Sequence, residues 1–310
     1  MPPAAERLSL NAHLYHVSKV SDHLRHLIVD IARAAKYIQA AIRTTEAGLT
    51  GTKNQFGEEQ IKLDVLSDQI ISAHLQESKL VAGYISEEQQ EMVEMEPKAP
   101  FSVVFDPLDG SSLVDVNFSV GSIFGIYEGA SVIGRTSRKL KAALYTVYGP
   151  RTLLIYSTGT GVHEFILNEV GEFILLRQYL GVADDAKNYS PGNLAAIAAI
   201  AGYKAVLDSW LGNSKMTLRY SGCMAADVHH VISKGQGIFT NIGGSKYPDG
   251  KLRLVFECGP FAYLMEQAGG AASDGSLSIL DKKITDIDQR TPLVIGSKNE
   301  VERVCRLLSK

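Results

Sequence analysis

Residues 101–112 read Phe-Ser-Val-Val-Phe-Asp-Pro-Leu-Asp-Gly-Ser-Ser. The apolar first half predicts a short buried strand, and Asp106 then opens a polar turn that runs through Asp109 and Gly110. A strand that delivers carboxylates and a glycine into a turn is typical of the ligand-binding edge of a sheet in an α/β protein. This stretch therefore predicts both the fold class and the position of a site.

Each residue of the turn has a chemical use. Asp106 and Asp109 can ligate a hard divalent cation, and the carbonyl of Leu108 offers a third oxygen. Gly110 and Ser111 can offer backbone N–H groups to a phosphate, because glycine lets the oxyanion approach without a Cβ in the way. The alternative is an ordinary polar turn, since Pro, Asp, Gly and Ser all favour turns.

A second acidic pair, Glu87-Glu88, follows the short apolar run 80–85. If this run and 101–105 form neighbouring parallel strands, both strands release their ends into one crevice. Adjacent carboxylates repel one another unless cations or solvent compensate their charge. We therefore prefer a site for two or three metal ions over a plain polar turn.

Composition excludes several classes of protein. The 310 residues are 45% hydrophobic, and 31 Lys and Arg face 34 Asp and Glu, so the net charge of -3 attracts neither nucleic acid nor an anionic membrane. The most apolar stretch, 194–203, has about half the length of a membrane span. Three widely spaced cysteines predict a reducing compartment. We expect a cytoplasmic protein and leave open an intracellular organelle such as a plastid or glycosome.

Hydrophobic periodicity predicts helices at 24–42 and 61–75, separated by a mobile loop at 48–57. The strands that we predict next are 80–85, 101–105, 121–127, 142–148, 153–157, 162–167 and 172–176. The second half alternates helices at 194–211, 224–233, 252–268 and the C-terminus with strands at 237–242 and 292–296. We interpret this order as a layered α/β fold with two mixed sheets and flanking helices, divided near residue 180 into halves 1–180 and 181–310.

Other charged residues are candidates through their position alone. The acids are Asp64 and Glu58 near the second helix, and Glu257 at a strand-to-helix transition. Each of them is equally well explained as a surface acid. The candidate cations for holding a distal phosphate are Lys251, Arg253 and Arg219, although a Lys or Arg side chain is usually just solvated.

From about residue 24 onward the sequence resembles the class I fructose-1,6-bisphosphatase and sedoheptulose-1,7-bisphosphatase family. The matching motifs occur in order at 56–67 (FGEEQIKLDVLS), 84–88 (YISEE), 105–127, 218–228 (LRYSGCMAADV), 237–241 (GIFTN) and 251–270. The resemblance implies an α-β-α-β-α sugar-phosphatase fold. It also implies Mg²⁺-dependent hydrolysis of a sugar bisphosphate by metal-activated water, in a homodimer or homotetramer.

The resemblance also implies roles for particular residues. The metal ligands would be Glu87, Glu88, Asp106, the Leu108 carbonyl, Asp109 and Glu257, which would hold two or three Mg²⁺ with Mn²⁺ as a substitute. The residues that activate water would be Asp64, Glu88 and Glu58. The substrate would contact Gly110, Ser111, Ser112, Asn193, Arg219, Tyr220, Met224, Asn241, Lys251 and Arg253, with Arg219 supplied by a neighbouring subunit.

Four motifs favour the sedoheptulose branch of the family: 56–60 (FGEEQ), 189–194 (YSPGNL), 217–220 (TLRY) and 239–241 (FTN). The favoured reaction is hydrolysis of the 1-phosphate of sedoheptulose-1,7-bisphosphate to sedoheptulose 7-phosphate, with fructose-1,6-bisphosphate as the close alternative. The shorter Asn241, where fructose enzymes usually place tyrosine, would leave room for one more carbon. The rivals are an inositol-phosphate or nucleotide-phosphate phosphatase and a catalytically silent metabolite-binding protein of the same fold.

Cys223 departs from the family pattern. The family more often has a small hydroxyl residue or a glycine at this position between Tyr220 and Met224. We interpret Cys223 as a packed side chain rather than an oxidation target.

Overall fold

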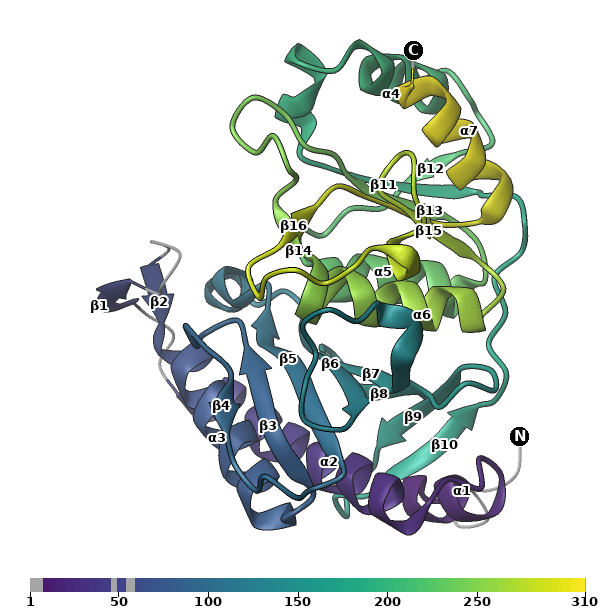
Figure 1. Cartoon of the computed structure of the whole chain (residues 1–310). Coiled ribbons are helices and arrows are strands. Elements are labelled where there is room, and N and C mark those ends of the chain that lie inside the picture. Colours follow the sequence, from purple (N-terminus) through teal and green to yellow (C-terminus); the bar gives the residue numbers. More distant parts are fainter. Residues whose placement is uncertain (1–7, 46–48, 54–58, 310) are drawn as a thin grey trace.

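The structure, a computed structural model, describes residues 8–45, 49–53 and 59–309. Its elements stack in five layers: helices, an eight-stranded sheet, two central helices, a five-stranded sheet and outer helices (Figure 1). This order confirms the predicted layered α/β fold with two mixed sheets. None of the helices in the described part of the chain combines the length and the apolar character of a membrane span.

The first layer holds α1 (Leu10–His16), α2 (Asp22–Thr44) and α3 (Lys62–Ser78). The helix predicted at 24–42 is confirmed as α2, and its buried stripe packs against the large sheet. The predicted loop is wrong at Leu49–Lys53, which forms β1 and pairs with β2 (Glu59–Ile61). Residues 48 and 54–57 of that predicted loop, and Glu58, lie outside the described residues.

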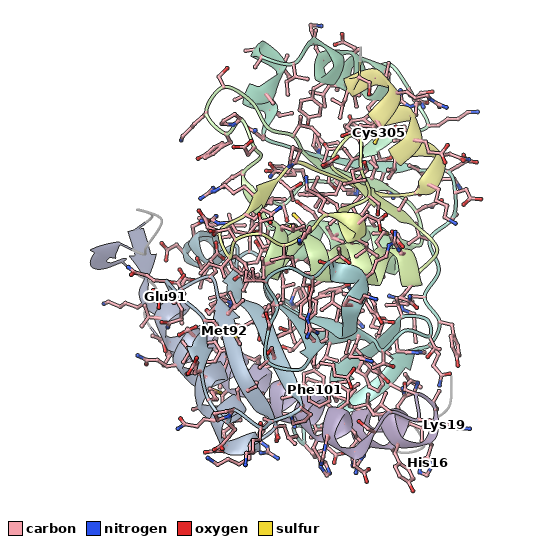
Figure 2. The ribbon with its side chains drawn as sticks, viewed as in Figure 1. His16, Lys19, Glu91, Met92, Phe101 and Cys305 are labelled. Carbon is pink, nitrogen blue, oxygen red and sulfur yellow. The ribbon has the colours of Figure 1, made fainter. Side chains whose placement is uncertain are left out.

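The large sheet has the strand order β10-β9-β8-β7-β6-β5-β3-β4. Its strands are β3 (Val81–Ser86), β4 (Val93–Glu94), β5 (Phe101–Asp109), β6 (Val120–Glu128), β7 (Leu140–Tyr148), β8 (Thr152–Ser157), β9 (His163–Leu167) and β10 (Phe173–Arg177). The pair β3 and β5 is parallel, as predicted, while the other pairs are antiparallel. Phe101 lies at the start of β5, so the acidic turn is at the opposite end of the strand (Figure 2).

Two central helices, α5 (Met224–Lys234) and α6 (Gly259–Gln267), fill the space between the sheets (Figure 1). The predicted helix at 252–268 is wrong at its start. Residues Leu252–Arg253 form β14, which pairs with β16 (Arg290–Thr291), and Leu254–Cys258 form a π-helical turn, η5. Apolar periodicity does not distinguish this wide turn from an α-helix, because both are fully buried here.

The second sheet has the strand order β12-β11-β13-β17-β15, and α4 (Ala201–Leu211) and α7 (Lys298–Leu308) cover its outer face (Figure 1). Its strands are β11 (Asn188–Gly192), β12 (Thr217–Leu218), β13 (Ile238–Asn241), β15 (Ala271–Ser273) and β17 (Leu293–Gly296). The helix predicted at 194–211 is instead a 3₁₀ turn, η4 (Leu194–Ala198), followed by α4. The division near residue 180, between β10 and β11, stays a prediction.

Candidate active site

A cavity of about 370 Å³ lies where the ends of β3 and β5 meet η5 and the segment before α5. Parallel pairing of β3 and β5 brings Glu87 and Asp106 together, which is the crevice that the sequence predicts. The predicted site residues that line this cavity are Asp64, Glu87, Glu88, Asp106, Leu108, Asp109, Gly110, Ser111, Ser112, Tyr220, Met224, Asn241, Lys251, Arg253 and Glu257.

Two predicted substrate residues are not among the lining residues. Asn193 has a left-handed backbone, and its side-chain amide donates a 2.5 Å hydrogen bond to the carbonyl of Ile242. Arg219 is exposed beyond the edge strand β12 and donates to the carbonyl of Leu218 at 2.8 Å. Glu58 lies outside the described residues. The substrate and catalytic roles of these three residues stay predictions.

Three lining residues were not predicted: Gly222, Phe239 and Leu252. Phe239 lies two residues before Asn241 on β13, so the two side chains share one face of the strand. The sequence contained a signal for Phe239. Side chains two residues apart on a strand point to the same face, so a site that includes Asn241 also predicts Phe239 beside it.

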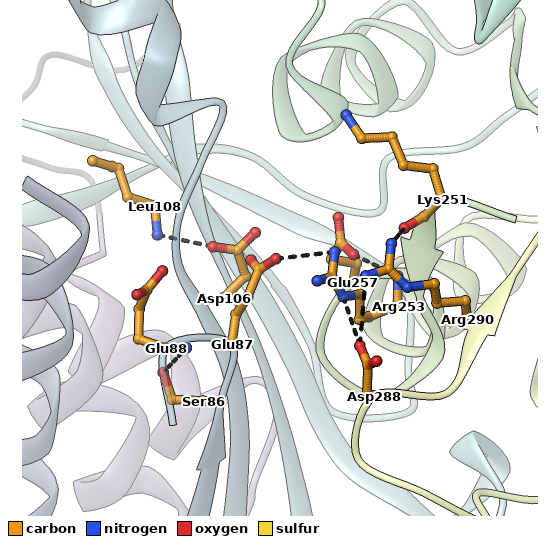
Figure 3. Close-up of polar contacts among 10 residues, drawn as sticks. All are labelled: Ser86, Glu87, Glu88, Asp106, Leu108, Lys251, Arg253, Glu257, Asp288 and Arg290. Atoms are coloured by element: carbon orange, nitrogen blue, oxygen red, sulfur yellow. Dashed lines mark hydrogen bonds and ion pairs between the residues drawn. The ribbon is translucent and has the colours of Figure 1, made fainter. Parts of the chain in front are cut away.

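Three carboxylates form the centre of the site. Asp106, Asp109 and Glu257 each place an oxygen within 4.8 Å of the others. The π turn η5 brings Glu257 from the second half of the chain to the end of β5, and the backbone N–H of Arg253 donates to Glu257 Oε2 at 2.6 Å (Figure 3). The amide of Leu108 holds Asp106 Oδ1 at 2.9 Å. A set of carboxylate oxygens suits a hard divalent cation.

The electrostatics of the cluster favour a bound cation. Burial raises the pKa of Asp106 well above its usual range, and repulsion from Glu87, Asp109 and Glu257 raises it further. Burial raises the pKa of Glu257 to about 7. Buried carboxylates that disfavour their own charge are stabilised when a divalent ion binds among them, so the residues present fit a metal site.

Asp64 and Asp68 occupy one face of α3, as their spacing predicts. Ser111 Oγ donates to Asp64 Oδ2 at 3.1 Å, which places this carboxylate beside the turn after β5. Asp68 accepts hydrogen bonds from Ser86 at 2.5 Å and Gln89 at 2.7 Å, which fixes the end of β3. Asp64 is therefore the carboxylate of α3 that faces the cavity.

Arg253 lies within the acidic region. Its guanidinium is 3.5 Å from Glu87 Oε1 and 3.1 Å from Asp288 Oδ1, and its side chain is only 4% exposed (Figure 3). A buried arginine between two carboxylates offsets part of their repulsion. This environment differs from the distal phosphate contact that the sequence predicts, which stays a prediction.

The turn after β5 packs against the start of α5. Gly110 has a φ of 78°, and a Cβ there would lie 2.8 Å from the Cβ of Cys223, so the position requires glycine. Asp109 Oδ2 accepts the N–H of Ala225 at 2.5 Å. Cys223 is fully buried, and burial together with the charge of Asp109 raises the pKa of its thiol well above the usual value.

The carboxylate cluster beside the turn at Gly110 suits a site that binds a divalent cation, and comparison with known proteins gives the family. The family model of the fructose-1,6-bisphosphatase N-terminal domain matches residues 7–178, and that of the C-terminal domain matches residues 182–309. The chain therefore belongs to the fructose-1,6-bisphosphatase family of sugar-bisphosphate phosphatases.

Individual relatives support this assignment. A class 1 fructose-1,6-bisphosphatase from Geobacter sulfurreducens is 46% identical over 95% of this chain and 94% of its own length. A chloroplastic sedoheptulose-1,7-bisphosphatase from Triticum aestivum is 40% identical over 91% of this chain and 72% of its own. The crystal structure of Leishmania major fructose-1,6-bisphosphatase in holo form has a TM-score of 0.92 at 30% identity, and the match covers 98% of this chain and 99% of that one.

Proposed function

We propose that the chain hydrolyses the 1-phosphate of fructose-1,6-bisphosphate with Mg²⁺, and that sedoheptulose-1,7-bisphosphate is its second substrate. The sequence motifs alone favour sedoheptulose-1,7-bisphosphate as the first substrate. The similar bacterial relatives named as fructose enzymes are 42–46% identical, however, whereas the wheat sedoheptulose enzyme is 40% identical. We therefore place fructose-1,6-bisphosphate first.

The observation that carries this proposal is the arrangement of the cavity. The three carboxylates Asp106, Asp109 and Glu257 lie beside the turn that begins at Gly110. Lys251 contributes an ammonium group to the same cavity wall. A bisphosphate requires both features, because the phosphate that reacts needs metal ions and the other needs a cation or hydrogen-bond donors.

In the proposed mechanism, bound Mg²⁺ would supply a Lewis acid that lowers the pKa of water and neutralises phosphoryl charge. Its ligands would be Glu87, Glu88, Asp106, Asp109, Glu257 and the Leu108 carbonyl. The backbone amides of Gly110 and Ser111 hold the 1-phosphate at the start of η2 (Ser111–Val116), where helix N–H groups lack intrahelical partners. Asp64, with Glu88 as the alternative, accepts the proton of the attacking water. The bond between phosphorus and the sugar oxygen breaks as the water attacks, and the departing sugar oxygen takes up a proton to leave as the sugar hydroxyl.

One observation favours the sedoheptulose substrate as well. Oδ1 of Asn241 is buried and has no hydrogen-bond partner within the described part of the chain, and the residue lines the cavity. A substrate hydroxyl would satisfy this oxygen, since a buried acceptor left alone costs free energy. We propose that the short asparagine leaves space for the seventh carbon of the longer sugar.

We also propose that the protein is a homodimer or homotetramer, because Arg219 is exposed at the edge of the second sheet and outside its own cavity. We propose that, in the oligomer, this guanidinium contacts the cavity of a neighbouring subunit. Sedimentation velocity, together with the loss of activity in Arg219→Ala, tests this arrangement. A monomer with full activity would contradict it.

A side-by-side assay tests the proposed function. Phosphate release from both sugar bisphosphates is measured with Mg²⁺, using Asp109→Asn as the control and inositol monophosphate as a competing substrate. We expect the highest kcat/KM for fructose-1,6-bisphosphate and a loss of at least about 10²-fold in Asp109→Asn. Preference for inositol monophosphate would contradict the proposal, and the absence of release from every ester would favour a silent binding protein.

A further inference from the structure

Asp109 is held from one side by α5. Its Oδ2 accepts the backbone N–H of Ala225 at 2.5 Å and lies 3.1 Å from Sγ of Cys223. An ionised carboxylate has no hydrogen to donate, so the hydrogen in the second contact belongs to the thiol. Both contacts use Oδ2, which leaves Oδ1 of Asp109 available to the carboxylate cluster.

Cys223 is itself fixed in place. It is the N-cap of α5, and its sulfur accepts the N–H of Ala226 at 3.4 Å. Its own N–H donates to Ser221 Oγ at 3.2 Å, and the N–H of Ser221 donates to Asp227 at 2.8 Å. The side chain is fully buried against Gly110. The thiol therefore has one defined position relative to Asp109.

We propose that Cys223 is a positioning residue whose thiol hydrogen bond fixes the orientation of Asp109 for metal binding. This inference rests on the proposed role of Asp109 as a metal ligand. A hydrogen bond to the second oxygen of a ligating carboxylate orients the ligand, and loss of such a partner typically weakens metal affinity by about 10- to 100-fold. Cys223 also couples the start of α5 to the turn after β5.

Two substitutions separate the hydrogen bond from packing. Cys223→Ala removes the donor, whereas Cys223→Ser keeps a donor in a smaller side chain. Cys305→Ala is the matched control, because it is the same chemical change on α7 in the outer layer, away from the cavity (Figure 2). Thermal unfolding in the absence of metal identifies any variant that fails to fold.

The test measures the Mn²⁺ dissociation constant by calorimetry on the substrate-free protein, and the Mg²⁺ concentration that gives half-maximal phosphate release. We expect Cys223→Ala to raise both by about tenfold, Cys223→Ser to stay within about twofold of the wild type, and Cys305→Ala to leave both unchanged. Unchanged values in folded Cys223→Ala would overturn the inference. Equal losses in the folded Ala and Ser variants would also overturn it, because packing would then account for the effect.

Asp109→Asn distinguishes this failure from failure of the proposed function. If Asp109→Asn loses Mn²⁺ binding while Cys223→Ala keeps it, only the positioning role fails. If Asp109→Asn binds Mn²⁺ as well as the wild type does, Asp109 is not a ligand, and the proposed function and this inference fail together.

Discussion

Ser111 Oγ donates a 3.1 Å hydrogen bond to Oδ2 of Asp64, which joins the first turn of η2 to the first turn of α3. The contact places a carboxylate next to the turn proposed to hold the reacting phosphate. It connects two segments that are far apart in sequence, and it fixes the carboxylate that we propose as the general base.

Asp64→Asn keeps the shape of this side chain but removes its basicity. We expect kcat to fall by roughly 10²- to 10⁴-fold, while Mn²⁺ affinity changes by less than about tenfold. Ser111→Ala removes the hydrogen bond and keeps the carboxylate, so its loss of kcat is smaller. Steady-state kinetics with calorimetry check both variants, and equal kcat values in Asp64→Asn and the wild type would contradict a role as base.

Metal affinity is expected to depend on pH through Glu257. Burial raises the pKa of this carboxyl to about 7, so below pH 7 a bound metal must displace its proton. We expect the half-saturating Mg²⁺ concentration to fall as pH rises from 6 to 8, and to level off above the pKa. In Glu257→Gln the dependence is weaker. A half-saturating concentration that rises with pH over this range would contradict this role of Glu257.

Stability at acid pH depends on His229 of α5. Burial lowers the pKa of His229 to about 4, and its Nδ1 lies 3.0 Å from the hydroxyl of Tyr145. At pH values between the unfolded pKa of about 6.5 and the lower folded pKa, His229 binds a proton only in the unfolded chain. The free energy of unfolding therefore falls as pH falls. Glu164 and Arg177 also face His229, and their opposing effects on its charge are smaller than that of burial.

The wild type is expected to lose about 2 kcal/mol more free energy of unfolding between pH 7 and pH 5 than His229→Gln loses. Urea unfolding of both proteins at the two pH values gives this difference directly. Other buried carboxyls titrate alike in both proteins, so their contributions cancel in this difference. Equal losses would show that His229 is not neutral in the folded state.

Substrate length is expected to depend on Asn241, whose side chain is buried in the cavity wall. In Asn241→Tyr the larger ring fills the space proposed for the seventh carbon. The ratio of kcat/KM for the sedoheptulose substrate to that for the fructose substrate should fall by roughly tenfold. Asn213→Tyr, at an exposed turn after α4, is the control. An unchanged ratio in Asn241→Tyr would eliminate this explanation of specificity.

The sequence predicts the part of the site that depends on local patterns. The acidic turn 106–112 and the strand ends at Glu87 and Asp106 follow from apolar runs that stop at carboxylates, and parallel pairing brings them together. Glu257 is a candidate through its position alone, and the family resemblance adds its role as a metal ligand. The ion pairs of the buried Arg253 with Glu87 and Asp288 were not predicted, because they join three distant segments and depend on tertiary packing.

Local sequence patterns also fail to predict some elements of the fold. The strand β11 was missed because Asn188–Gly192 contains proline and glycine and lacks apolar alternation, yet it pairs with two strands. The π turn at Leu254–Cys258 has the apolar character of the helix that follows it. In both cases, neighbouring strands and helices determine the local conformation.

Direct metal binding tests the central claim that carboxylates from both halves of the chain form one cation site. Mn²⁺ is titrated into metal-free protein, and the remaining free ion is measured by electron paramagnetic resonance for the wild type, Asp106→Asn and Glu257→Gln. The account predicts Mn²⁺ binding by the wild type and a weakening of about 10²-fold or more in each variant. A wild type that binds no Mn²⁺, or variants that bind it equally well, would contradict the account.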